Sequence, residues 1–118
     1  MDEDFLRDLF VSLADVRVRR MFGGQGVYSG GRIVAVVVQG ELYLKSDAVS
    51  EPIYETADLT RWTYAREGRA PTRMPYYRMP ESALDDQDEA KSWIAIADAA
   101  SRRASQQSRR PKRATKAK

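Results

Sequence analysis

The chain has 118 residues, a length that fits about one domain with a single modest core. It contains neither cysteine nor histidine, which excludes an imidazole base, a thiolate nucleophile, disulfides and the common zinc ligand sets. Its 20 Lys and Arg exceed its 17 Asp and Glu, but eight of these cations and none of the acids follow Ser101. Residues 1–101 therefore hold 12 cations and 17 acids, so the part predicted to fold has a net charge of −5.

The first segment predicts an amphipathic helix over residues 3–14. An acidic first turn suits the helix dipole, and an apolar stripe follows it at helical spacing: Phe5, Leu6, Leu9, Phe10 and Leu13. The same segment is acidic where a signal peptide is basic. No apolar run approaches the roughly 20 residues of a membrane helix, so we expect a cytoplasmic protein.

Four segments with strand patterns come next, at residues 16–22, 26–28, 32–38 and 41–45. Glycines between them, in the pairs Gly30-Gly31 and Gln39-Gly40, favour two-residue hairpin turns. Such turns predict an antiparallel register in which three pairs face each other: Tyr28 with Ile33, Ala35 with Leu44, and Val37 with Leu42.

This register defines two sheet faces. We expect the helices to cover the first, which carries Tyr28, Ile33, Ala35, Val37, Leu42 and Leu44. The second carries Val27 and Lys45 beside a candidate interface that consists of Val34, Val36, Val38 and Tyr43. Because this face is too apolar for open water, it predicts an interface, and a second copy of the chain is the simplest partner. The alternative is that the segment around Ile53 and Tyr54 covers it.

A short helix broken by Pro52 is expected between Asp47 and Asp58, followed by a hairpin that turns near Glu67-Gly68. Pro75 in this hairpin indicates an edge strand or a bulge. Basic and aromatic side chains interleave in it, as they do on surfaces that bind single-stranded nucleic acid. An ordinary amphipathic strand pair has the same pattern, so both interpretations stay open. The candidate nucleic-acid contacts here are Arg73, Tyr76, Tyr77 and Arg78.

A last helix is expected over residues 86–103, with Trp93, Ile94 and Ala97 buried, and it leads into a basic tail at residues 102–118. The tail has no large apolar side chain, so we predict that it is disordered. It either binds nucleic-acid phosphates without sequence preference or only solubilises the chain. Its candidate contacts are Arg109, Arg110, Lys112 and Arg113.

The glycine-rich stretch RRMFGGQGVYSGGR, residues 19–32, raises the question of a phosphate-binding loop. A dinucleotide fingerprint that starts at Gly24 needs a glycine at position 29, which is Ser29, and the lysine of a P-loop is absent as well. A strand rather than a helix follows, so no helix dipole is available for a phosphate. We therefore predict turns, with Gly23 and Gly24 reversing the chain and Gly26 allowing a close approach.

Several motifs together resemble the TfoX N-terminal domain family, the amino-terminal module of the TfoX/Sxy regulators of bacterial natural competence. The resemblance spans about residues 3–100 and rests on Met21-Phe22-Gly23-Gly24, Gly26, Tyr28, Leu42-Tyr43-Leu44-Lys45, Thr63-Tyr64 and Met74-Pro75-Tyr76-Tyr77. It implies a two-layer α+β fold with helices on one face of an antiparallel sheet of five or six strands. It implies a structural turn for Met21, Phe22, Gly23, Gly24, Gly26 and Tyr28.

The resemblance also bears on function. Full-length members are thought to act with the cyclic-AMP receptor protein and add a helical domain where this chain has its basic tail, and they offer no catalytic residues to carry over. We therefore predict a non-enzymatic interaction module, an accessory transcriptional regulator that acts through a protein partner, with no catalytic, metal or cofactor site. The alternative is a nucleic-acid-binding protein that uses the basic tail.

Overall fold

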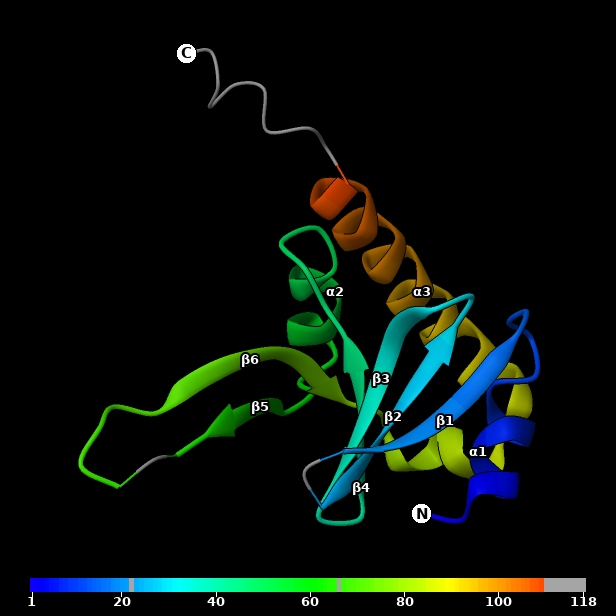
Figure 1. Cartoon of the computed structure of the whole chain (residues 1–118), viewed down its shortest axis with the longest axis horizontal. Coiled ribbons are helices and arrows are strands. Elements are labelled where there is room, and N and C mark those ends of the chain that lie inside the picture. The colour runs from blue at the N-terminus through cyan, green and yellow to red at the C-terminus, as the bar shows by residue number, and fades with distance from the viewer. Residues whose placement is uncertain (22, 66, 110–118) are drawn as a thin grey trace.

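A computed structural model describes residues 1–21, 23–65 and 67–109. Its elements are α1 (Glu3–Leu9), β1 (Val16–Met21), β2 (Gly24–Ser29), β3 (Arg32–Val38), β4 (Glu41–Lys45), α2 (Glu51–Thr56), β5 (Arg61–Tyr64), β6 (Thr72–Arg78), the 3-10 helix η1 (Glu81–Asp85) and α3 (Gln87–Arg109). The strands form one antiparallel sheet in the order β1-β2-β3-β4-β6-β5 (Figure 1). The predicted α+β class is confirmed.

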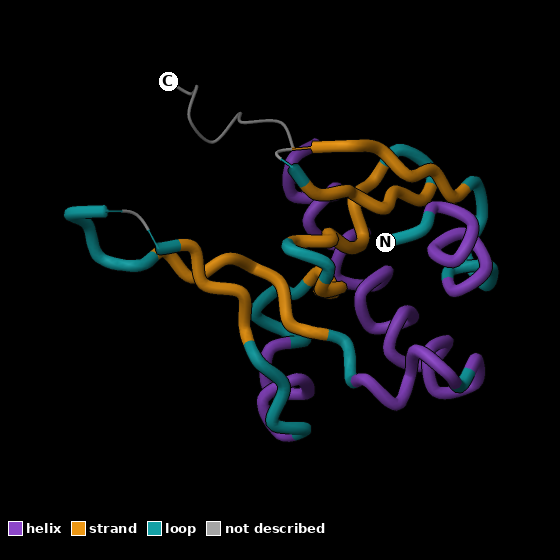
Figure 2. Tube along the Cα trace, turned by 90° about the horizontal axis from the view of Figure 1, so that it is seen from below, coloured by secondary structure: helices purple, strands orange, loops and turns teal. Residues whose placement is uncertain are grey.

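The helices lie on one side of the sheet and leave the other side open (Figure 2). The core lies between these two layers, where α3 packs across β3 and β4. Three stacked rings anchor α2 to it: Tyr54 lies 5.0 Å from Tyr77 and 5.9 Å from Trp93 between ring centroids. Each of these rings removes a large apolar area from water, which stabilises the docking of α2.

A β-bulge in β3 corrects the predicted sheet faces. The three predicted cross-strand pairs are present, but Val27 lies opposite Ala35 while Tyr28 lies opposite Ile33, so Val34 is the extra residue of β3. A bulge interrupts the alternation of side chains between faces. Val27 and Val34 are therefore fully buried in the helix-side core, whereas Tyr28 and Ile33 are only half-buried and belong to the open side.

The helix boundaries also differ from the predicted ones. Helix α1 ends at Leu9 rather than at residue 14, because Phe10 and Leu13 reach the core from the turns that follow it. Helix α2 starts at Glu51, with the proline in its first turn, where a missing N–H costs nothing. The helix η1 was not expected from the sequence.

Helix α3 runs past its predicted end at residue 103 and continues to Arg109, so the first part of the predicted basic tail is helical. The Arg103 guanidinium binds the Asp47 carboxylate through two hydrogen bonds, of 2.5 Å from Nε and 3.0 Å from Nη2. This pair holds the last part of α3 against the loop between β4 and α2. Residues 110–118 of the predicted tail lie outside the described residues.

Gly23 lies in the predicted turn after β1 and Gly26 makes the predicted close contacts, but Gly24 is already the first residue of β2 and pairs with Met21. Gly23 has a φ of 77°, and a Cβ on Gly24 would lie 2.0 Å from the carbonyl oxygen of Val37. A Cβ on Gly26 would lie 2.7 Å from the Met21 sulfur and 3.0 Å from the Tyr28 ring. These contacts explain why the strands need glycine here without invoking a phosphate.

Candidate functional site

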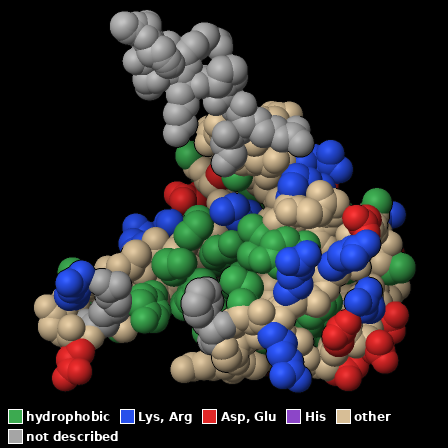
Figure 3. Space-filling model, viewed as in Figure 1, with side chains coloured by type: hydrophobic (Ala, Val, Ile, Leu, Met, Phe, Trp, Pro, Cys, Tyr) green, Lys and Arg blue, Asp and Glu red, His purple; other side chains and the backbone are tan. Residues whose placement is uncertain are grey.

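The open side of the sheet carries a cluster of aromatic side chains from three strands. The Trp62 ring on β5 lies 6.1 Å from Tyr43 on β4 and 6.0 Å from Tyr76 on β6, measured between ring centroids. The three rings are tilted against one another, a favourable arrangement for aromatic pairs. Figure 3 shows hydrophobic side chains gathered near the middle of this side, with Lys and Arg side chains around them.

Two cations lie over aromatic rings on this side of the sheet, one over the cluster's Tyr76 and one over Tyr28. The Lys45 ammonium is 5.2 Å from the centroid of the Tyr76 ring, and the Arg19 guanidinium is 5.6 Å from that of Tyr28. Neither cation has a carboxylate within 4.0 Å in the described part of the chain. We call this surface the aromatic face and define it as Arg19, Tyr28, Val36, Tyr43, Lys45, Trp62 and Tyr76.

The aromatic face is partly desolvated. Burial, reinforced by the nearby Tyr28, raises the pKa of Tyr76 to about 12. Burial lowers the pKa of Lys45, although the Asp47 carboxylate works in the opposite direction. An ammonium in partial burial without a close carboxylate is electrostatically costly, because water is replaced by a less polar environment. An incoming carboxylate would relieve this cost.

Three of the four residues of the predicted interface lie on the open side of the sheet, and two of them, Val36 and Tyr43, belong to the aromatic face. Val36 pairs with Tyr43 across β3 and β4, and Val38 lies two residues further on the same side. Val34 does not belong to it, because the bulge turns this side chain into the core. The alternative covering segment is not there either: Tyr54 is fully buried among the helices, and Ile53 is 45% exposed.

The predicted nucleic-acid contacts are not brought together. Tyr77 lies on the helix side, where its hydroxyl donates to the Glu55 carboxylate and its side chain is 1% exposed. Arg73 lies near the same carboxylate at 3.9 Å, and Arg78 pairs with Glu41 on the open side. Tyr76 alone of these rings belongs to the aromatic face. Arg109 ends α3, while Arg110, Lys112 and Arg113 lie outside the described residues.

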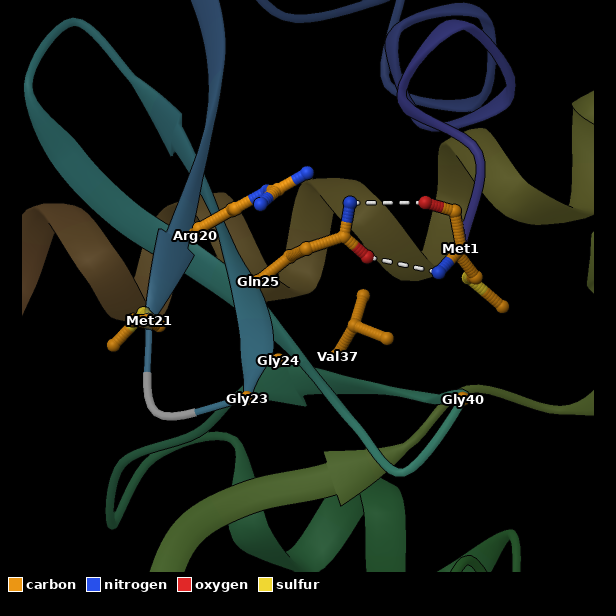
Figure 4. Close-up of a pocket in the computed structure, with 8 residues that line it drawn as sticks. All are labelled: Met1, Arg20, Met21, Gly23, Gly24, Gln25, Val37 and Gly40. Atoms are coloured by element: carbon orange, nitrogen blue, oxygen red, sulfur yellow. Dashed lines mark hydrogen bonds between the residues drawn. The ribbon is translucent and has the colours of Figure 1, made fainter.

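A hollow, separate from the aromatic face, lies at the end of the sheet around the turn between β1 and β2. It encloses about 590 Å³ and is lined by Met1, Arg20, Met21, Gly23, Gly24, Gln25, Val37 and Gly40. Figure 4 shows Gln25 reaching toward Met1, with Arg20 extending on the same side. The Met1 ammonium donates to Gln25 Oε1 at 2.9 Å, and Gln25 Nε2 donates back to the Met1 carbonyl at 2.9 Å.

The sequence did not identify the members of these two sites that matter most. Trp62 was assigned to a separate hairpin, because nothing local shows that it meets Tyr43, nineteen residues earlier along the chain. Arg19 and Arg20 were both interpreted as charged residues of a strand and were not assigned to different sites. Their alternation in β1 was the available signal, since neighbours in a strand point to opposite faces.

Among residues 1–21, 23–65 and 67–109, no three acidic side chains lie close enough together to hold a metal ion. In the same ranges, no helix combines the length and the apolar character needed to cross a membrane.

Comparison with protein families identifies the fold. The model of the TfoX N-terminal domain matches residues 8–101 of the chain. The chain belongs to this family. The match includes all six strands and most of α3, so the TfoX N-terminal domain comprises both the aromatic face and the turn between β1 and β2. No curated protein matches the sequence. The family supports a TfoX-like regulatory or interaction module.

Proposed function

We propose that this TfoX N-terminal domain is a non-enzymatic regulatory module that binds an acidic segment of a protein partner through its aromatic face. The observation that carries the proposal is the ring cluster of Trp62, Tyr43 and Tyr76 on the side of the sheet that the helices leave open. Aromatic side chains are enriched at the centres of protein interfaces. The family membership agrees with an accessory role in transcription.

Charge decides which partner fits. Lys45 and Arg19 lie over the Tyr76 and Tyr28 rings without a carboxylate within 4.0 Å among the described residues. Glu41, an acid on the same side of the sheet, already pairs with Arg78. A second copy docked face to face would bring these cations toward one another, and like charges in an interface are costly. An acidic segment with apolar side chains would neutralise both cations and cover the rings.

The ring geometry favours protein over nucleic acid at this face. Base stacking requires free ring faces, but Lys45 lies over the Tyr76 ring, Arg19 lies over Tyr28, and Tyr76 is only 7% exposed. The net charge of residues 1–101, −5, also opposes approach of a polyanion to this part of the chain. The basic residues after Ser101 remain the alternative route to nucleic acid.

Neighbouring arginines on β1 allow a matched test, because Arg19 belongs to the aromatic face while Arg20 lines the hollow on the other side. Tagged wild-type chain, Arg19→Glu and Arg20→Glu would capture partners from a lysate of the native organism, with quantification by mass spectrometry. We expect a partner recovered by the wild type and Arg20→Glu and reduced at least about tenfold by Arg19→Glu. Equal recovery by all three folded chains would contradict the proposal.

A further inference from the structure

The hollow around the turn between β1 and β2 is lined by positive charge and by no negatively charged side chain. Its eight residues include the Arg20 guanidinium and the Met1 ammonium but no Asp or Glu. Arg20 has no carboxylate within 4.0 Å in the described part of the chain. In a body whose residues 1–101 carry five more acids than cations, a hollow lined by an arginine and by no acid is a local exception.

Two of its polar residues, Gln25 and Met1, are held in place by hydrogen bonds. The two 2.9 Å hydrogen bonds between Gln25 and Met1 fix the ammonium over β2, and Gln25 itself stands between Arg20 and Val37 in the sheet register. A fixed arrangement lowers the entropy lost when a ligand binds.

The glycines keep this hollow open. A Cβ at Gly23 or at Gly40 would meet no atom within 4 Å, so the space beside these turns is free. Gly24 instead lets β2 approach the Val37 carbonyl so closely that backbone forms the wall. The resulting volume, about 590 Å³, lies within the range of small-molecule sites, roughly 300–1,000 Å³.

We propose that this hollow is a binding site for a small organic anion, whose phosphate or carboxylate group binds the Arg20 guanidinium. The guanidinium offers two parallel N–H donors that match either group. The site is separate from the aromatic face, since Arg20 and Arg19 project from opposite sides of β1. The inference therefore does not depend on the proposed protein partner.

Amide NMR of the full chain tests the proposal with inorganic phosphate and with acetate, each titrated at constant ionic strength. We expect saturable shifts at Gly23, Gly24 and Gly40, with Gly30 and Gly31 at the next hairpin turn as internal controls that stay unchanged. Saturation by phosphate alone, by acetate alone or by both would each support the site and would show which group it prefers.

Arg20→Gln should weaken the binding of the anion about tenfold or more, whereas the matched variant Arg19→Gln should leave it within about twofold. Arg20→Lys should retain part of the affinity, because the charge remains but the fork is lost. Both arginines are exposed, so the variants should keep the wild-type amide spectrum elsewhere. Shifts that do not saturate, that occur equally at Gly30 and Gly31, or that persist in Arg20→Gln would overturn the proposal.

Discussion

Replacing Asp47 with Asn should destabilise the fold in a way that depends on pH. Asp47 joins the last part of α3 to the loop before α2, because it accepts two hydrogen bonds from Arg103 and one of 3.0 Å from the Ser50 backbone N–H. The bond from Arg103 is the main reason why the pKa of Asp47 falls from 3.8 to about 2. Asn keeps the shape of the side chain but loses its charge.

The size of the effect follows from this pKa. A fall from 3.8 to about 2 corresponds to roughly 2.4 kcal/mol of stability at neutral pH, at about 1.36 kcal/mol per unit. The Asp47 side chain is 22% exposed and that of Arg103 is 37% exposed, so solvent screening reduces the expected loss to about 1–2 kcal/mol. For a domain of this size that loss lowers Tm by roughly 5–10 °C.

The sign with pH is fixed by linkage. A carboxyl group whose pKa is depressed in the folded state contributes its full stability above the unfolded pKa near 4 and loses it as pH falls through about 2. The free-energy difference between the wild type and Asp47→Asn should therefore shrink to about half at pH 3 and to about one sixth at pH 2, and approach zero below that.

Urea denaturation of both chains at pH 7 and at pH 3 measures this difference. Asp15→Asn is a matched control, because Asp15 forms an exposed pair with Arg17 at 3.2 Å and Asn tolerates its φ of 50°. We expect the control to change stability by less than about 0.5 kcal/mol at either pH. A deficit in Asp47→Asn that is equal at both pH values, or no larger than that of the control, would refute the reasoning.

Four further substitutions test other parts of the structure. Gly24→Ala should lower the free energy of unfolding by at least about 3 kcal/mol, because its Cβ would lie 2.0 Å from the Val37 carbonyl oxygen. Gly23→Ala should lower it by only about 1–2 kcal/mol, because its φ of 77° is the sole source of strain. Equal losses in denaturant unfolding would contradict this. Lys45→Met should raise the melting temperature, because it removes a partly buried charge, and it should weaken partner capture. A lower melting temperature would show that this charge does not destabilise the fold. Tyr77→Phe should cost about 1–2 kcal/mol in the same unfolding assay, because it removes the hydroxyl that donates to Glu55, and an unchanged midpoint would mean that this bond contributes nothing.

The sequence predicted the layers, the hairpins and the register, because these depend on local signals. Apolar alternation and glycine turns predict Ala35 opposite Leu44 and Val37 opposite Leu42, as the structure has them. The bulge at Val34 escaped detection, since β3 is apolar at nearly every position and an extra residue leaves no gap in the pattern. The assignment of sheet faces beyond the bulge was wrong for this reason.

The candidate sites were less predictable than the fold, because their members come from distant segments. The ring of Trp62 reaches Tyr43 only because β6 inserts between β4 and β5 in the sheet. Arg103 and Asp47, which form an ion pair, lie 56 residues apart in the sequence. Helix α3 continues beyond this pair into a segment without large apolar side chains. No periodic pattern in a single sequence marks such contacts.

Photo-crosslinking from the aromatic face tests the central claim most directly. Benzoylphenylalanine in place of Tyr43 would be compared in cells with the same residue in place of Phe5, an exposed ring on α1 that lies outside the aromatic face. We expect Tyr43, but not Phe5, to crosslink to an acidic segment of one other protein, and Arg19→Glu to remove this product. Crosslinks to a second copy of the chain, to nucleic acid, or equally from both positions would contradict the proposed function.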